Sequence, residues 1–332
     1  MSRVWVSPTL RDEVVATIRE YQARTGYRVR HLLGLAAIPS GKFYDWCRRV
    51  SRPNRHNGRV VKGHWLLDWE RAAIIDYAHR HDTDGYRRLS YQMIDEDVAY
   101  ASPSSVYRVL QAAGLLQAAP VSDRSLRGCG YEQPTGAHQE WHTDITCVNV
   151  LGTYLLLIAI LDGYSRYVVH HDLRAHIDHA DVMLVIEQAR DKYPEARPRI
   201  ISDRGGPFIA KEFKEYLRLA GLKQTLISAG YPQSNGKIER FYRTVKSECV
   251  RRSSFLSLAD ARQIIAGFIE TYNNRRLHSA LDYIAPMDIL RGRRAEIIKT
   301  REVKLAQARV LRQEHNNQIP TLNQTPVLSG FH

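Results

Sequence analysis

The sequence contains little cysteine, no long apolar run and a deficit of acidic residues. Its few cysteines are too scattered for a disulfide framework or a Cys-x2-Cys zinc site, and we expect free thiols in a reducing compartment at Cys47, Cys129, Cys147 and Cys249. The longest apolar run, residues 154–161, is far too short to cross a bilayer. The first residues show no basic-then-apolar signal pattern. We therefore expect a cytoplasmic protein with no membrane partner.

The deficit of acids makes the chain strongly basic. Its 332 residues include 48 Lys and Arg against 35 Asp and Glu, which gives a formal net charge of +13. The excess is uneven, because residues 131–240 are nearly neutral and the segments on either side carry the surplus positive charge. An evenly basic surface kept for solubility is the alternative, but it would spread the charge. The pattern favours a near-neutral catalytic core with flanking regions that bind a polyanion such as DNA.

Residues 1–62 are predicted to form a helix-turn-helix DNA-binding region with a basic arm. Apolar spacing indicates a helix over 8–25, a short second helix follows Gly26, and Ser40 can cap a third helix. Between residues 23 and 62 there are ten Lys or Arg residues and one acid. A solvated pair of charged helices is the alternative. The expected DNA contacts are Lys42, Arg48, Arg49, Arg52, Arg55 and Arg59.

Residues 63–116 are predicted to form a second helical, helix-turn-helix-like domain. Three helices are expected, over 67–78, 85–95 and 104–113. Ser102 and Pro103 supply the N-cap and first-turn proline of the third helix. Arg108 is the candidate DNA contact, but the charge of this segment is close to balanced, so a purely structural role is equally well supported. Residues 117–138, with several prolines and glycines, are expected to be a linker.

Residues 139–290 alternate between strand and helix patterns. Strands are expected over 141–148, 154–161, 167–172, 199–202 and 223–228. Helices are expected over 177–193, 210–220, 236–252 and 258–273. Strand hairpins followed by alternating helices and strands indicate an α/β core, with a mixed five-stranded sheet and flanking helices. Residues 291–332 are predicted to form a basic C-terminal helix and a polar tail.

Three carboxylates of this core are candidates for metal-dependent phosphodiester chemistry. Asp144 lies within the first expected strand, Asp203 directly follows the fourth, and Glu239 lies in the first turn of the helix predicted after residue 235. Two Mg²⁺ ions can activate an attacking hydroxyl and stabilise the leaving oxygen. Mg²⁺ prefers carboxylates completed by water and substrate phosphate, so three acids suffice, and Mn²⁺ can substitute. We expect Asp144 to bridge the two ions, with Asp203 and Glu239 each holding one.

Helical geometry tests the position of Glu239. The apolar residues from Ile238 to Cys249 recur at helical spacing and form one buried stripe, and Glu239 lies about 100° from its start. Its carboxylate can therefore face a cleft. An i, i+4 surface ion pair with Arg243 is the alternative. The cations around Glu239 are expected to contact DNA phosphates, and they are Lys237, Arg240, Arg243 and Lys246.

Two further segments leave alternatives open. Asp162 precedes a glycine between two expected strands, which favours a turn-forming residue over a metal ligand. Residues 272–278 (Tyr-Asn-Asn-Arg-Arg-Leu-His) combine groups that could stack on bases and bind phosphate. They could equally close the C-terminus of the preceding helix.

The core resembles a known family, the transposases of bacterial insertion sequences whose catalytic domain is similar to that of retroviral integrases. The resemblance extends from about residue 140 to 290. It rests on the thirty-five residues between Asp203 and Glu239 and on five blocks in this order: Trp-His-Thr-Asp-Ile-Thr at 141–146, Leu-Asp-Gly-Tyr-Ser-Arg at 161–166, Ser-Asp-Arg-Gly-Gly at 202–206, Pro-Gln-Ser-Asn-Gly-Lys-Ile-Glu-Arg-Phe at 232–241, and Tyr-Asn-Asn-Arg-Arg-Leu-His-Ser-Ala-Leu at 272–281.

The resemblance implies a ribonuclease H-like core preceded by all-α helix-turn-helix domains. It maps the family's catalytic acids onto Asp144, Asp203 and Glu239. It also implies Mg²⁺-dependent cleavage at the ends of an insertion element and strand transfer into target DNA. The implied partners are the double-stranded terminal repeats, the target duplex and further copies of the chain on DNA, in a nucleoid-associated bacterial protein. The His/Cys zinc module of retroviral integrases has no counterpart in this sequence.

Two other functions are compatible with parts of the pattern. A catalytically inactive, transposase-derived DNA-binding regulator would keep the helix-turn-helix regions, but intact acids at all three positions argue against it. A nuclease acting on RNA/DNA hybrids would keep the acids. Two candidate helix-turn-helix units favour duplex DNA instead.

Overall fold

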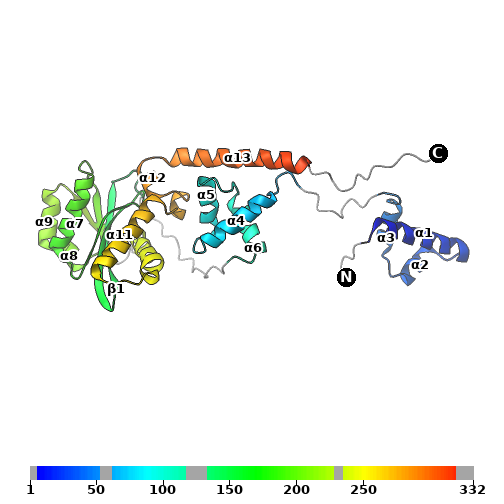
Figure 1. The fold of residues 1–332 in the computed structure, drawn as a ribbon, viewed down its shortest axis with the longest axis horizontal. Coiled ribbons are helices and arrows are strands. Elements are labelled where there is room, and N and C mark those ends of the chain that lie inside the picture. The colour runs from blue at the N-terminus through cyan, green and yellow to red at the C-terminus, as the bar shows by residue number, and fades with distance from the viewer. Residues whose placement is uncertain (1–5, 53–61, 117–132, 228–234, 319–332) are drawn as a thin grey trace. The chain divides into compact units, whose positions relative to one another are not determined.

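The computed structural model describes residues 6–52, 62–116, 133–227 and 235–318 (Figure 1). The chain divides into two compact units, one comprising residues 1–67 with 307–332 and the other residues 68–306. Among the described helices, none combines the length and the apolar character needed to span a bilayer.

The first unit contains the three helices expected near the N-terminus. They are α1 (Pro8–Thr25), α2 (Val29–Leu35) and α3 (Ser40–Cys47). Ser7 caps α1 by accepting a hydrogen bond from Leu10 N, and Gly26 ends it with φ of 69°. Ser40 is the first residue of α3 rather than its cap, a position taken by Pro39. The three helices enclose a small apolar core formed by Val15, Ile18, Leu32, Leu33 and Phe43.

The second unit begins with three helices, α4 (Asp68–Arg80), α5 (Tyr86–Asp95) and α6 (Pro103–Ala112). Ser102 caps α6 as the sequence predicts, since its hydroxyl accepts a hydrogen bond from Ser105 N at 3.4 Å. The long helix α13 (Arg294–Gln318) starts in this unit and extends past the expected start of the polar tail at residue 316. Within the unit, Arg301 of α13 forms an ion pair with Asp95 of α5 at 2.6 Å.

A five-stranded sheet forms the centre of the second unit. Its strands are β1 (Glu140–Val150), β2 (Thr153–Asp162), β3 (Val168–Arg174), β4 (Arg199–Ser202) and β5 (Lys223–Leu226). The order is β3-β2-β1-β4-β5, with β1 antiparallel to β2 and parallel to β4. β2 pairs antiparallel with β3, and β4 pairs parallel with β5. The predicted mixed sheet and ribonuclease H-like fold are confirmed.

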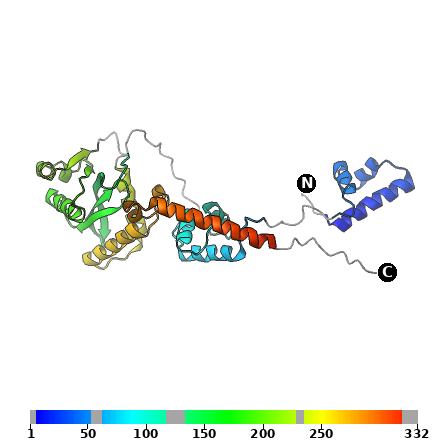
Figure 2. The same ribbon diagram turned by 90° about the horizontal axis from the view of Figure 1, so that it is seen from above.

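Helices cover both faces of this sheet, as Figures 1 and 2 show. The helices on one face are α7 (His179–Lys192), α8 (Gly206–Ile209) and α9 (Lys211–Leu219); those on the other are α10 (Gly236–Thr244) and α11 (Leu258–Asn274). Along β2, Leu157, Ala159 and Leu161 pack toward α10 and α11, and the intervening Ile158 and Ile160 pack toward α7 and α9. Successive side chains of a strand point to opposite faces, and both faces of β2 are buried. This explains why the apolar run of β2 is continuous.

Two local features differ from the sequence-based prediction. The helix expected over 236–252 is α-helical only to Thr244 and continues as a π-helical segment (Val245–Cys249) and a 3-10 turn (Val250–Arg252). The short helix α8 follows Asp203 and was not expected. Propensity patterns do not distinguish π from α turns, because both bury the same stripe of apolar residues.

Asp162 and Asn273 have structural roles at the end of β2 and the start of β3. The fully buried Asp162 carboxylate accepts hydrogen bonds from His138 N and from Ser165 N and Oγ, as expected of a turn-forming residue. Asn273 Oδ1 accepts from Val168 N at 2.8 Å, and its Nδ2 donates to Val168 O at 3.0 Å. Asn273 therefore has a structural role, because it joins α11 to the edge strand β3.

Asn273→Ala should lower the melting temperature by several degrees. The change leaves a buried N–H and a buried carbonyl without partners, at about 1–3 kcal/mol for each group, and a unit of this size loses about 2–4 °C per kcal/mol. Asn274→Ala, at the exposed neighbouring position, is the control and should melt close to the unchanged protein. Equal melting temperatures for the two variants would contradict the role of Asn273.

Candidate active site

The central strand β1 directs Asp144 toward the face covered by α10. Even-numbered residues of β1 face that side, because Val148 and Val150 pack in the core formed with α10 and α11. Trp141, of opposite parity, packs with α7 and α9. Asp144 is half-buried, and its Oδ1 accepts a hydrogen bond from Ile145 N at 2.8 Å.

The parallel pairing of β1 with β4 brings Asp203 to the same place. His142 is paired with Ile201, so the same register continued two residues further sets Asp144 opposite Asp203. Side chains at paired positions of parallel strands point to the same face. Gly205 N donates to Asp203 Oδ1 at 2.9 Å, and a Cβ on Gly205 would lie 3.0 Å from that oxygen. A side chain at position 205 would therefore crowd the Asp203 carboxylate.

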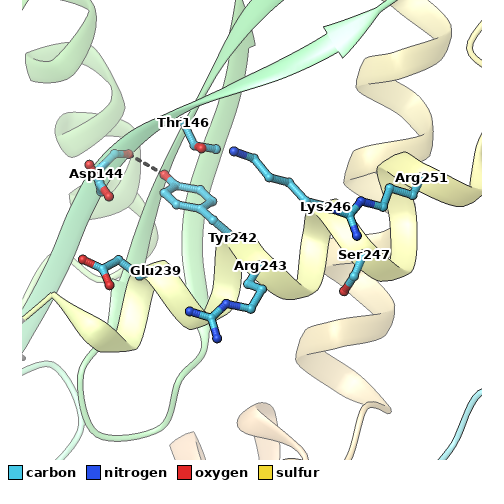
Figure 3. A pocket seen from close by; sticks show the side chains of 8 residues that line it. All are labelled: Asp144, Thr146, Glu239, Tyr242, Arg243, Lys246, Ser247 and Arg251. Carbon is cyan, nitrogen blue, oxygen red and sulfur yellow. Dashed lines mark hydrogen bonds between the residues drawn. The ribbon is translucent and has the colours of Figure 1, made fainter. Parts of the chain in front are cut away.

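Helix α10 carries Glu239 at the edge of its packed face. The predicted apolar stripe is confirmed, since all its members are buried: Ile238, Phe241, Tyr242, Val245 and Cys249. Glu239 lies in the first turn and is exposed. In the described part of the chain it forms no ion pair with Arg243, so the surface-pair alternative is not realised (Figure 3).

The three carboxylates affect one another electrostatically. Burial raises the pKa of the Asp144 carboxyl to about 6, and the negative charges of Asp203 and Glu239 also raise it. Hydrogen bonds from Ile145 N and from the Asn235 amide act in the opposite direction. Negative charges that raise the pKa of a neighbouring carboxyl mark a place where a cation would relieve repulsion.

The donor set fits hard divalent cations. The three side chains offer only carboxylate oxygens, which Mg²⁺ and Mn²⁺ prefer, and they leave coordination positions for water and substrate phosphate. Within the described ranges, no three Asp, Glu, His or Cys side chains stand close enough to form a complete metal-binding group by themselves. Among the described residues, the three carboxylates therefore do not form an assembled metal site.

Basic side chains follow Glu239 along α10 and the turns after it, and they line a cavity (Figure 3). Asp144 and Glu239 line a cavity of about 300 Å³ whose other lining residues are Thr146, Tyr242, Arg243, Lys246, Ser247 and Arg251. Lys246 extends toward Thr146 across the cavity. Arg251 is twelve residues from Glu239 and would lie about 120° around an unbroken α-helix. The π-helical turns between them take more residues per turn, which reduces that rotation.

Two of the expected phosphate contacts lie elsewhere. Lys237 Nζ donates to the carbonyl of Gly163 at 3.0 Å, at the turn that follows β2. Burial lowers the pKa of Lys237 to about 8, and the nearby Arg166 lowers it further, while Glu140 and Asp162 raise it. Arg240 is exposed. Neither Lys237 nor Arg240 lines the cavity, whereas Arg243 and Lys246 do.

The candidate DNA contacts of the helical regions are mostly exposed. On α3, Lys42 lies over the Trp46 ring at 5.0 Å, and both Arg48 and Arg49 lie within 4 Å of Asp45. Arg52 is exposed, and Arg55 and Arg59 lie outside the described residues. On α6, Arg108 is exposed and donates to Ser104 O at 3.2 Å. Their roles in DNA binding remain predictions.

Sequence reasoning missed two residues that hold the site together. The Tyr242 hydroxyl donates to the backbone carbonyl of Asp144 (Figure 3), and Asn235 Nδ2 donates to Asp144 Oδ2 at 3.3 Å. Both lie on the face of α10 that meets β1. Tyr242 was recognised only as part of the apolar stripe, and Asn235 was assigned to a loop.

Known proteins match this core over all three acids. Residues 134–232 and 220–286 match two families described as integrase core domain. The putative transposase InsK of insertion sequence IS150 from Escherichia coli is 26% identical over 80% of this chain and 95% of its own length. An uncharacterised 31.7 kDa protein of insertion element IS407 from Burkholderia multivorans is 28% identical over 68% of this chain and 81% of its own length. The chain is thus similar to insertion-sequence transposases over most of its length, and its core matches the integrase core domain.

Among solved structures, the chain is similar to the HTLV-2 integrase catalytic core in complex with magnesium. It is 18% identical, covers 47% of this chain and 98% of its own length, and has a TM-score of 0.39. The segments of this chain that match the integrase core domain include β1 with Asp144, β4 with Asp203 directly after it, and α10 with Glu239.

Proposed function

We propose that this transposase cuts DNA at the ends of its insertion element and joins the cut ends to target DNA, using Asp144, Asp203 and Glu239 with two Mg²⁺ ions. Mn²⁺ can replace Mg²⁺. Two such ions would activate the attacking hydroxyl and stabilise the leaving oxygen of each phosphodiester. Asp144 would contribute to both ions, and Asp203 and Glu239 would each hold one.

The observation that carries the proposal is the position of the three carboxylates on adjoining elements: Asp144 lies on β1, Asp203 directly follows the paired strand β4, and Glu239 lies in the first turn of α10, which packs against the same sheet. Asp203 and Glu239 come from different elements, and both raise the pKa of Asp144. Acids gathered this way destabilise one another unless a cation joins them. Arg243, Lys246 and Arg251 beside them can bind the phosphates of a strand that enters the cavity.

The test is strand mapping. The transposase is incubated with labelled duplexes that carry candidate element ends, with Mg²⁺, Mn²⁺, Ca²⁺ or EDTA, and the cut strand and any joined product are resolved on a denaturing gel. Cleavage at the element end with Mg²⁺ and Mn²⁺ only, followed by joining, is the expected result. Metal-independent cleavage, or cleavage at random positions, would contradict the proposal.

The proposed partners are the duplex ends of the element, the target duplex and further copies of the chain assembled on DNA. An inactive DNA-binding regulator is the weaker candidate, since the family and the acids both favour an enzyme. A regulator would bind the same DNA and yield no cut strand in the strand-mapping assay.

Lys246→Glu should reduce strand cleavage and joining by about tenfold to a hundredfold, because a charge-assisted contact to phosphate contributes about 1.5–3 kcal/mol. Lys246→Ala should have a smaller effect in the same direction. Lys211→Glu, on the exposed face of α9 across the sheet, makes the same change in net charge and serves as the control. Equal losses at the two positions would mean that only net charge matters and that the cavity wall does not contact DNA.

A further inference from the structure

Asn235 connects two of the acids that the proposed function uses. Its side-chain Nδ2 donates to Asp144 Oδ2 at 3.3 Å. Its backbone carbonyl accepts the N–H of Glu239 at 3.1 Å and so makes the first helical hydrogen bond of α10. One residue thus contacts the carboxylate of Asp144 and the backbone of Glu239.

The Asp144 carboxylate is fixed on both oxygens. Oδ1 accepts from its neighbour Ile145 N at 2.8 Å, and Oδ2 accepts from Asn235. With both oxygens engaged, one rotamer of Asp144 is favoured, and the remaining lone pairs point in fixed directions. In metal sites, groups that do not themselves bind the metal often orient the ligating side chains through such hydrogen bonds.

Burial makes this contact specific to an amide. Asn235 is only 6% exposed. Its Oδ1 is buried and has no hydrogen-bond partner among the residues that the structure describes. A buried acceptor without a donor is costly, and a water of a hydrated cation or a group of the substrate could supply the donor.

A second contact holds the same helix against Asp144. The Tyr242 hydroxyl donates to the Asp144 carbonyl, and Tyr242 follows Asn235 by seven residues. Asn235 is the N-cap of α10 and Tyr242 lies within the helix, and both side chains donate hydrogen bonds to Asp144. Tyr242 anchors the backbone of Asp144, and the Asn235 side chain reaches its carboxylate.

We infer that Asn235 is a positioning residue, which orients the Asp144 carboxylate and sets its separation from Glu239 so that the acids can hold divalent cations together. This inference rests on the proposed function and adds a residue to it. Asn235 acts through Asp144, because its amide nitrogen donates to the Asp144 carboxylate. Its loss therefore weakens metal binding without removing a carboxylate.

The test measures binding of Mn²⁺ alone to the full-length transposase, from the electron paramagnetic resonance signal of free Mn²⁺. Asn235→Ser keeps a residue suited to a helix start but cannot reach Asp144. We expect its affinity for Mn²⁺ to fall by about tenfold to a hundredfold, the usual cost of losing a group that orients a metal ligand. The Mg²⁺ concentration for half-maximal strand cleavage should rise by a similar factor.

Asn273→Ser is the matched control, because it makes the same substitution at another buried asparagine, which joins α11 to β3. It should lower the melting temperature and leave the Mn²⁺ affinity unchanged below the transition. Asn235→Gln retains the amide on a longer side chain and should recover part of the affinity, and it replaces Asn235→Ser as the test variant should the latter not fold.

Affinity within twofold of the unchanged protein in both Asn235 variants would overturn the inference. Failure of the proposed function has a different signature: Asp144→Asn would then also leave Mn²⁺ binding unchanged. A weakened Asp144→Asn together with an unaffected Asn235→Ser would keep the metal site and reject the positioning role.

Discussion

Asp203→Asn or Glu239→Gln should abolish strand cleavage and joining while leaving DNA binding intact. Each change keeps the size of the side chain and removes the charge that holds a cation. Loss of metal stabilisation of the reacting oxygens is worth several kcal/mol, about a thousandfold in rate. Binding should persist because the affinity for DNA comes from the basic segments outside the near-neutral core.

The measurement is single-turnover cleavage of a labelled element end with Mg²⁺, beside a gel-shift titration of the same protein preparations. Asp191→Asn, at an exposed carboxylate of α7 on the other face of the sheet, removes the same charge and should cleave normally. Cleavage above trace level by either active-site variant would reject the assignment of these acids.

The sequence was sufficient to predict the strands and the helix on or beside which the three acids lie, and the structure gives the reason; the catalytic role of the acids stays a prediction. Alternation along β1, the short apolar strand before Asp203 and the stripe from Ile238 to Cys249 are all periodic patterns, and each pattern specifies which side chains face the core. In a mixed sheet, β1 and the end of β4 place Asp144 and Asp203 on the face that α10 covers, and α10 carries Glu239. That sheet is confirmed.

The features that sequence reasoning missed depend on contacts rather than on periodicity. The π-helical turns after Thr244 retain the apolar stripe, so no pattern marks them. The amide of Asn235 contacts a residue ninety-one positions earlier in the chain. The ammonium of Lys237 meets a carbonyl on the turn after β2 rather than open solvent. Tertiary packing decides which group each of these side chains contacts, and no local pattern in a single sequence marks such a contact.

For the cations on and just after α3, the sequence shows where the positive charges lie, and the structure shows which of them are exposed. The side chains of Lys42 and Arg48 are exposed on a helix of the first unit, and Arg49 lies beside them. Each cation that neutralises a DNA phosphate releases condensed counterions, and therefore contributes about 0.9 to the slope of log affinity against log salt. The ion pairs with Asp45 are exposed and weak, and do not prevent this.

A triple variant with Lys42, Arg48 and Arg49 replaced by alanine should therefore bind duplex DNA roughly a hundredfold more weakly at 0.1 M salt, with a salt slope reduced by about 2.7. Fluorescence anisotropy with a labelled duplex, from 50 to 300 mM salt, measures both quantities on the full-length transposase. The matched control replaces three exposed cations of α9, Lys211, Lys214 and Arg218, and changes the net charge equally. If both triple variants lose the same affinity and slope, DNA responds to overall charge and α3 is not a recognition helix; a loss confined to the α3 variant assigns DNA binding to that helix.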